Sequence, residues 1–222
     1  MTLRITRETL LDGTVQQMQR HHASSHPDMH WRTEAEMARL LHQALAELGE
    51  GQDLWVFGYG SLIWNPAFEF VEKRCALLRG WHRRFCLKMY MGRGTPDHPG
   101  LMLALDRGGA CRGVAFRIEA AKVPQELGLL WQREMYGGSY NSRWVTLQAG
   151  GESFRALTFV CNHAHPRYTR ELTVEQAASI IATAKGDLGT CREYLENTVA
   201  HLRQLGVRDT GLSRIAAALP KL

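Results

Sequence analysis

The first 53 residues carry a helical pattern of apolar positions. Apolar residues recur every three or four positions over residues 3–20 and again over 33–48, which predicts two amphipathic helices. Gly49 follows the second stretch as an end signal. The linker, residues 21–31, contains four histidines but no cysteine or carboxylate at a recognisable ligand spacing: His21, His22, His26 and His30. We interpret it as a solvated loop rather than a metal site. Residues 1–53 are therefore expected to be a helical N-terminal extension packed on the core.

From residue 54 the pattern changes to short runs of β-forming residues separated by turn residues. Five runs precede the next helix: LWVFGYGSLIW, KRCALLRGW, RRFCLKMY, LMLALD and CRGVAFRI. The last two are separated by Arg107-Gly108-Gly109-Ala110, where we expect a hairpin. A second hairpin is predicted between RWVTLQ and SFRALTFVC, through Gly150-Gly151.

Helices dominate the rest of this region. One is predicted over residues 123–136. Thr173 to Gln176 and Thr190 to Glu193 both fit the capping-box spacing at the start of a helix, and a shorter helix is predicted near 212–219. Because the strands cluster instead of alternating with helices, we predict one α+β domain over 54–222, with a small barrel or curled sheet flanked by helices.

Composition limits the class of protein. A chain of 222 residues is long enough for one well-packed core but short for two ordinary domains. It has no run of about 18 apolar residues, so we predict no membrane insertion. The N-terminus lacks the apolar segment of a secretory signal. The five cysteines are an odd number without a CxxC pair, which is typical of reduced thiols in a cytoplasmic protein.

The net charge of +5 lies beyond the N-terminal extension. Residues 1–53 contain 5 of the 27 basic and 8 of the 22 acidic residues. A moderate excess of this kind favours an anionic small molecule or nucleic acid as partner, although most such excesses are solvated surface. Basic and aromatic residues alternate between Trp81 and Tyr90, as in some RNA-binding strands. Cationic strand faces are common, however, and we predict no nucleic-acid partner.

A second group of residues resembles half a metal site. Cys161, His163 and His165 lie close together at the end of a predicted strand. No further cluster of ligand residues accompanies them in the sequence, and we therefore predict no metal.

An apolar strand runs directly into a Gly-x-Gly-Ser turn at residues 58–61. Glycines let the backbone turn sharply and let a ligand approach the amide groups, and such amides hold a carboxylate or stabilise an oxyanion. The turn is not a dinucleotide fingerprint, because the third glycine is missing, and it lacks the lysine of a P-loop. Nor does Ser61 stand in a GxSxG nucleophile elbow. The alternative is a tight structural turn with Tyr59 in the core.

Glu134 occupies an unusual position on the helix predicted over 123–136. At about 100° per residue it falls in the middle of the apolar stripe that contains Val123 and Leu130, where an unpaired carboxylate is costly. It also lies in the last turn, where the negative end of the helix disfavours another negative charge. Both effects raise the pKa of a carboxyl group toward the range of a general acid–base. The alternative is a buried pair with a tyrosine or an arginine, and Arg133 reaches Glu134 only by bending back.

Several blocks of the sequence, in this order, resemble the ChaC-type γ-glutamylcyclotransferases, a family that degrades glutathione. The blocks are VFGYGSLIWNPAFEF, GWHRRFCL, GRGTPDHPGLMLALDRGGACRGVAFR, WQREMYGGSY and EYLENTVAHLRQLG. The N-terminal extension is similar to that of longer bacterial members. The resemblance implies a γ-glutamylcyclotransferase-like small mixed β-barrel flanked by helices. It also implies cleavage of glutathione to 5-oxoproline and cysteinylglycine, with no metal and no cofactor.

The resemblance also implies roles for individual residues. Glu134 matches the acid–base residue of the family. Gly138 and Tyr140 match a Gly-x-Tyr segment, which makes Tyr140 a substrate-binding residue; the proline that often follows it is replaced within Asn141-Ser142. The loop that holds the γ-glutamyl group corresponds to Val56, Phe57, Gly58, Tyr59, Gly60, Ser61 and Leu62.

Two other functions are open at this point. A cyclotransferase that acts on other γ-glutamyl peptides or γ-glutamylamines fits the same residues. Family members have also been associated with cation transport, so a non-catalytic regulator on the same fold is the second alternative, although the retained Glu134 argues against it. The sequence indicates neither the oligomeric state nor the role of the N-terminal extension.

Overall fold

A computed structural model describes residues 4–26 and 29–220 of the chain. At its centre five strands form a closed barrel in the order β1-β3-β2-β4-β5. The β1–β5 and β3–β5 pairings are parallel, and the other pairings are antiparallel. The strands are β1 (Leu54–Gly58), β2 (Glu72–Met89), β3 (Gly100–Ile118), β4 (Tyr140–Ala149) and β5 (Glu152–Cys161). This architecture confirms the predicted α+β class and the small mixed β-barrel flanked by helices.

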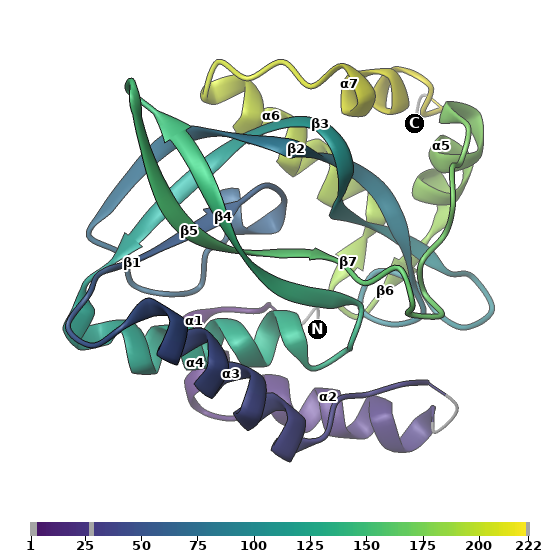
Figure 1. Cartoon of the computed structure of the whole chain (residues 1–222). Coiled ribbons are helices and arrows are strands. Elements are labelled where there is room, and N and C mark those ends of the chain that lie inside the picture. Colours follow the sequence, from purple (N-terminus) through teal and green to yellow (C-terminus); the bar gives the residue numbers. More distant parts are fainter. Residues whose placement is uncertain (1–3, 27–28, 221–222) are drawn as a thin grey trace.

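The helices form two groups on opposite sides of the barrel (Figure 1). Beneath it in that view lie α1 (Arg7–Leu11), α2 (Thr14–Ser25), α3 (Glu34–Leu48) and α4 (Val123–Met135). The other group consists of α5 (Val174–Thr183), α6 (Cys191–Gln204) and α7 (Thr210–Ala217). Two 3-10 turns, η1 (Ser61–Ile63) and η2 (Ala120–Lys122), and a small pair of strands, β6 (Lys185–Gly186) and β7 (Gly189–Thr190), complete the structure.

β2 and β3 are long strands that pair along most of their length. The hairpin predicted at Arg107–Ala110 was wrong, because these residues lie inside β3. Gly108 and Gly109 have φ of 97° and 66°, and they lie opposite Gly80, whose φ is 80°, where the ladder shifts register. The glycines therefore bend both strands together around the barrel instead of reversing the chain. For the same reason KRCALLRGW and RRFCLKMY belong to one strand, β2.

The second predicted hairpin is confirmed. β4 and β5 pair from Tyr140↔Cys161 to Ala149↔Glu152. Gly150 and Gly151 between them have φ of 58° and 85°, which is the pair of left-handed residues that a two-residue hairpin turn needs. The two predicted capping boxes are also present, and they begin α5 and α6.

The N-terminal helices differ from the prediction in one place. The single helix expected over residues 3–20 is two helices, because Asp12 ends α1 and Gly13, with φ of 84°, turns the chain before α2. α2 continues to Ser25, so the first part of the expected linker is helical. The rest of that expectation falls partly on residues 27–28, and residues 1–3 likewise lie outside the described ranges.

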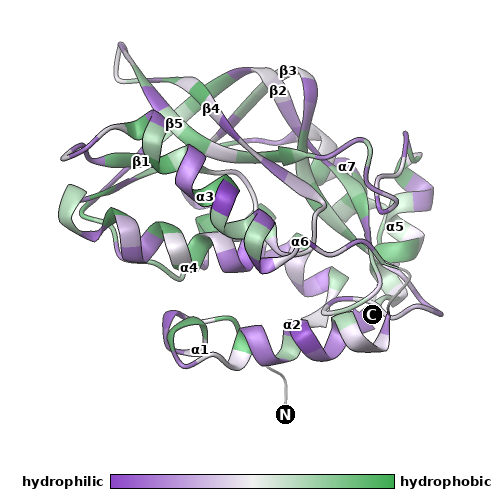
Figure 2. Cartoon of the chain, turned by 60° about the horizontal axis from the view of Figure 1, so that its bottom comes forward, coloured by the Kyte–Doolittle hydropathy of each residue, from purple (hydrophilic) through white to green (hydrophobic). Residues whose placement is uncertain are grey.

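The second predicted N-terminal helix is confirmed as α3. It begins after a capping box formed by Thr33 and Glu36 and ends at Gly49. Both α1 and α3 contact α4, and Figure 2 shows α1 and α2 lying along the side of α4 that faces away from the barrel. The N-terminal helices therefore cover α4, which is itself packed on the barrel.

β1 separates two hydrophobic cores. Successive side chains of a strand point to opposite faces, so Val56 packs with Trp131 of α4 in one core, and Phe57 packs with Tyr194 of α6 in the other. Val56 and Phe57 are both fully buried. The turn that follows β1 consequently begins where the two cores meet.

Across residues 4–26 and 29–220, no helix combines the length and the apolar character needed to cross a membrane. In the same ranges, no three His, Cys, Asp or Glu side chains converge as ligands of a metal ion do.

Candidate active site

Glu134 lies in the last turn of α4, on the face that packs against the barrel. Its side chain is 14% exposed. Burial raises the pKa of Glu134, and the adjacent Arg133 opposes this shift only in part. The pKa therefore moves toward the range in which a carboxyl group works as a general acid–base. Glu134 shares its face of α4 with four buried apolar residues: Val123, Leu127, Leu130 and Trp131.

Arg133 bends back over its neighbour. Its Nε lies 3.0 Å from Oε1 of Glu134. Its Nη2 donates to the hydroxyl oxygen of Ser61 (2.9 Å), and its Nη1 donates to the carbonyl oxygen of Asn65 (2.6 Å). The arginine side chain is only 6% exposed. The buried Glu–Arg pair that the sequence left open is thus present, and it joins Glu134 to the Gly-x-Gly-Ser turn.

Three tyrosines, two buried and one partly buried, lie close to Glu134. Tyr59 directly follows β1, Tyr140 is the first residue of β4, and Tyr194 lies in the first turn of α6. The hydroxyl groups of Tyr59 and Tyr140 donate to backbone carbonyls of the barrel at 2.7 and 2.8 Å. Burial raises the pKa of all three phenols, and the Glu134 carboxylate raises it further. All three are consequently neutral hydroxyls in the neighbourhood of the carboxyl group.

The Gly-x-Gly-Ser turn requires its glycines because other groups pack against the backbone. A Cβ on Gly58 would lie 2.9 Å from Cβ of Leu62, and one on Gly60 would lie 2.8 Å from Oη of Tyr194. The chain then enters η1. The N–H groups of Ser61 and Leu62 open this turn, and N–H groups at such a position have no acceptor within the helix.

The residues of the predicted loop fall into two sets. Val56 and Phe57 are fully buried strand residues, and Leu62, which is 5% exposed, packs in the core beside α4. Their side chains pack in the hydrophobic cores and thereby support the backbone of the loop. The other loop residues form the turn. Tyr59 and Ser61 lie near Glu134 or Arg133, as does Tyr140. Gly58 and Gly60 are the closely packed backbone positions of the turn, Gly58 against Leu62 and Gly60 against Tyr194.

A known protein family matches most of the chain. The model of a family described as ChaC-like protein matches residues 54–222. The chain belongs to the ChaC-like protein family.

Named relatives cover most of this ChaC-like chain. A protein of Escherichia coli (strain K12), named glutathione-specific gamma-glutamylcyclotransferase, is 42% identical over 193 residues, which are 86% of this chain and 83% of the relative. Glutathione-specific gamma-glutamylcyclotransferase 1 of Homo sapiens is 32% identical over 178 residues, 77% of this chain and 80% of the relative.

A solved structure shares the fold. It is the crystal structure of a selenomethionine-labelled γ-glutamyl cyclotransferase, specific to glutathione, from yeast. The TM-score is 0.70 at 20% identity, over 75% of this chain and 95% of the other. At that identity the likeness shows the barrel with its flanking helices and nothing finer.

Two further residues of the ChaC-like chain, Tyr194 and Arg93, were not assigned to the site by the sequence reasoning. Tyr194 stands close to Glu134, and it follows directly after the capping box of Thr190 and Glu193 that the sequence revealed. Arg93 lies beneath it, with its guanidinium 5.5 Å from the tyrosine ring and Nη1 donating to the carbonyl of Thr190 (2.7 Å). Both residues fall in blocks that carry the family resemblance. No local pattern distinguished them, because their proximity depends on the fold.

The cationic strand that suggested RNA binding is occupied by internal contacts. Arg83 pairs with Asp209 through Nε (2.7 Å) and donates through Nη1 to the carbonyl of Tyr59 (2.5 Å). Arg84 pairs with Asp106 (2.7 Å). Two of the strand's guanidinium groups therefore hold the fold of the ChaC-like chain together.

The segment that resembled half a metal site is also engaged. His163 Nε2 lies 2.6 Å from Asp106, and His165 is buried against His30. Cys161 lies beside Cys86, with their sulfur atoms 3.9 Å apart. Each of these three side chains therefore has a protein contact of its own.

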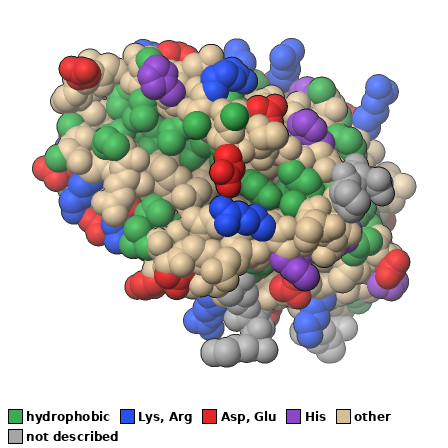
Figure 3. Space-filling view, turned by 90° about the horizontal axis from the view of Figure 1, so that it is seen from below, with side chains coloured by type: hydrophobic (Ala, Val, Ile, Leu, Met, Phe, Trp, Pro, Cys, Tyr) green, Lys and Arg blue, Asp and Glu red, His purple; other side chains and the backbone are tan. Residues whose placement is uncertain are grey.

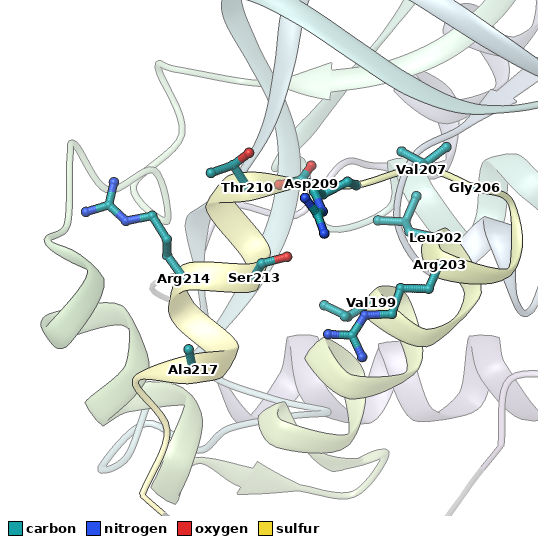
Figure 4. A pocket seen from close by; sticks show the side chains of 11 residues that line it. Val199, Leu202, Arg203, Gly206, Val207, Asp209, Thr210, Ser213, Arg214 and Ala217 are labelled. Atoms are coloured by element: carbon teal, nitrogen blue, oxygen red, sulfur yellow. The ribbon is translucent and has the colours of Figure 1, made fainter.

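A cavity of about 740 Å³ lies between α6 and α7 (Figure 4). Arginines 203, 208 and 214 are exposed at it, whereas Asp209 is held by Arg83. None of its lining residues belongs to the group around Glu134. The cavity and the group of residues around Glu134 are therefore separate parts of the molecule.

Proposed function

We propose that this protein is a glutathione-specific γ-glutamylcyclotransferase with Glu134 as its acid–base residue. Membership of the ChaC-like family and the names of the relatives support the reaction. One observation carries the choice of residue. Glu134 is a buried carboxyl group with a raised pKa, and Arg133 joins it to Ser61 of the Gly-x-Gly-Ser turn.

The reaction is an intramolecular acyl transfer. The α-amine of the γ-glutamyl residue attacks its own γ-carbonyl carbon and closes a five-membered lactam. The amide bond to the cysteinyl nitrogen breaks, which gives 5-oxoproline and cysteinylglycine. The α-ammonium group gives up one proton before the attack and its nitrogen gives up a second as the lactam forms. The leaving nitrogen takes up two protons and departs as an ammonium group, so neither water nor an oxidant is consumed. Holding the γ-glutamyl group of the substrate in the conformation that cyclises supplies a large part of the rate enhancement.

Glu134 takes the proton from the α-ammonium group and returns it to the leaving nitrogen. A carboxylate with the ordinary pKa of about 4.3 is a weak base toward an amine whose pKa is about 8. The raised pKa of Glu134 narrows this gap, which eases both proton transfers.

The surrounding residues bind and orient the substrate. The N–H groups of Ser61 and Leu62 hold either the α-carboxylate or the oxyanion of the tetrahedral intermediate. The neutral hydroxyls of Tyr140 and Tyr194 lie near Glu134. Because these groups are buried, they keep water from the acyl carbon and favour ring closure over hydrolysis.

Replacement of Glu134 by Gln tests the assignment. The amide keeps the shape and removes the basicity, so release of 5-oxoproline and cysteinylglycine from glutathione should fall by about 10²- to 10⁴-fold. Glu196→Gln, at an exposed carboxylate of α6, is the matched control and should retain full activity. Near wild-type turnover by a folded Glu134→Gln protein would show that another group moves the proton.

The identity of the substrate has its own experiment. The wild-type protein is given glutathione and γ-glutamylalanine at equal concentration, and 5-oxoproline is measured for both. We expect glutathione to be strongly preferred. Equal turnover would favour a general γ-glutamyl cyclotransferase. No turnover of either by a folded protein that binds glutathione would favour a non-catalytic regulator.

A further inference from the structure

Residues of the N-terminal extension contact α4 at both ends. At the start of α4, Arg7 Nη2 lies 2.5 Å from Oε1 of the fully buried Glu126. Further along, Gln19 Nε2 donates to the carbonyl oxygen of Gln132 (2.8 Å). Figure 2 shows α1 and α2 alongside α4. In Figure 3, the view from below, charged side chains are scattered among apolar ones. The helix that bears Glu134 is held between the barrel and the N-terminal extension.

Arg32 makes the contact nearest to the catalytic end of α4. It is buried, with 9% of the residue exposed. Its Nη1 donates to the carbonyl oxygen of Met135 (2.6 Å), and its Nη2 donates to the carbonyl oxygen of Tyr140 (2.7 Å) and to Oδ1 of Asn141 (2.9 Å). Its backbone N–H donates to the carbonyl oxygen of Tyr136 (3.0 Å). One residue thus binds both ends of the connection between α4 and β4.

That connection separates Glu134 from Tyr140. It consists of residues 136–139 and includes two glycines, of which Gly138 has φ of 70°. A short glycine-containing turn has many accessible conformations, and the last carbonyls of a helix have no donor within the helix. Arg32 supplies the donors and ties the two ends of the turn together. Its positive charge also suits the negative end of α4.

The residue before Arg32 is held by its own contacts. The ring of Trp31 lies 5.4 Å from that of Tyr136, and the Arg167 guanidinium lies 5.2 Å from the Trp31 ring. The segment that carries Arg32 is consequently packed against the turn itself. Arg32 is not a long side chain reaching in from a distant surface.

We propose that Arg32 is a positioning residue of the active site, which fixes the separation of Glu134 and Tyr140 by bridging Met135 and Tyr140. The inference rests on the proposed role of Glu134. It gives the N-terminal extension a part in the reaction, because the extension supplies the guanidinium. Arg32 does not touch the substrate and acts only through the residues that do.

Three variants test this inference: Arg32→Met, Arg32→Lys and the control Arg39→Met. Arg39 is an exposed arginine of α3 whose side chain donates to Gln43. Kinetics are measured at a temperature at which circular dichroism shows every variant to be fully folded. We expect Arg32→Met to lower kcat roughly tenfold to a hundredfold, because displacements of about 1 Å are that costly in catalysis. Substrate binding is largely kept, so KM should change by less than about threefold.

The lysine variant and an activity-independent measurement complete the test. Lysine keeps the charge but not the fork that reaches two carbonyls, so kcat should recover only in part. Hydrogen–deuterium exchange should show faster exchange of the amides at 136–141 in Arg32→Met, and no change in Arg39→Met. This measurement needs no substrate and is valid even if the proposed function is wrong.

Each outcome decides one question. If Glu134→Gln is inactive while Arg32→Met keeps its kcat and its exchange pattern, Arg32 is not a positioning residue, and the proposed function stands. A loss of thermal stability in Arg32→Met without a change in kcat also overturns the inference, because it shows a structural role only. If Glu134→Gln remains active, the proposed role of Glu134 fails. Faster exchange at 136–141 then still shows that Arg32 holds the turn.

Discussion

Arg133 and Glu134 are sequence neighbours whose side chains meet, with Nε 3.0 Å from Oε1, although a helix projects neighbouring residues about 100° apart. The arginine reaches this position because it also binds Ser61 and the carbonyl of Asn65. It therefore does two things at once. Its charge limits the rise in the pKa of Glu134 that burial causes, and its donors fix the turn that follows β1.

Arg133→Met should shift the pH dependence of the reaction. Loss of a nearby positive charge disfavours the ionised carboxylate, so the pKa of Glu134 rises further and the acidic limb of kcat moves to higher pH. At neutral pH we expect kcat to fall by at least about tenfold. Arg133→Lys keeps the charge and should shift the limb less. Arg155→Met removes an exposed arginine and serves as control; an unmoved acidic limb in Arg133→Met would contradict this account.

Glu134→Gln should stabilise the folded protein at neutral pH. In the wild type, burial raises the folded-state pKa of Glu134 above its ordinary value, so the folded state binds more protons than the unfolded one between the two values. Stability then decreases as pH rises from about 4.3 through the folded pKa. The glutamine variant lacks this loss. Thermal unfolding should give equal midpoints below about pH 4 and a higher midpoint for the variant at pH 7.

A variant that is no more stable than the wild type at pH 7 would mean that Arg133 fully compensates for the burial of Glu134. The Glu196→Gln control should show no pH-dependent difference, because that carboxylate is exposed. If the glutamine variant is more stable at pH 7, as expected, the buried charge of Glu134 is a stability cost that the activity requires, a common relationship at active sites.

Gly60→Ala should be destabilising because of one atom of Tyr194. The new Cβ would lie 2.8 Å from Oη, and overpacking of this kind costs about 1–3 kcal/mol. Tyr194→Phe removes that oxygen, so the same glycine replacement should cost clearly less in the phenylalanine background. Denaturant unfolding of the two single variants and the double variant measures the coupling. Additive costs would indicate that the backbone of Gly60, and not Tyr194, sets the requirement.

The parts of the site that sequence predicted are those governed by local patterns. The apolar stripe of α4 placed Glu134 inside, since helical spacing alone determines which residues share a face. The capping boxes of α5 and α6 and the Gly150-Gly151 hairpin were predicted for the same reason. Each depends on residues within four positions of one another. The strand pattern left a small barrel and a curled sheet open, and the family resemblance selected the barrel, which the fold confirms.

The parts that sequence did not predict depend on distant partners. A Gly-Gly pair with positive φ suits a turn or a bulge equally well, and only the pairing with Gly80 makes Gly108 and Gly109 a bulge. Helical geometry gave no reason for Arg133 to bend back, because Ser61 and Asn65 come from another part of the chain. Tyr194 was missed because it approaches Glu134 only through the packing of α6, which is distant in sequence from α4.

β1 has a mechanical consequence for the site. Its five residues form a wall shared by the core beside α4 and the core beside α6, with Val56 on one side and Phe57 on the other. A change of volume in either core moves the same wall, and the Gly-x-Gly-Ser turn moves with it because it continues directly from β1. Repacking one side therefore requires a matching change on the other if Ser61 is to stay within reach of Arg133.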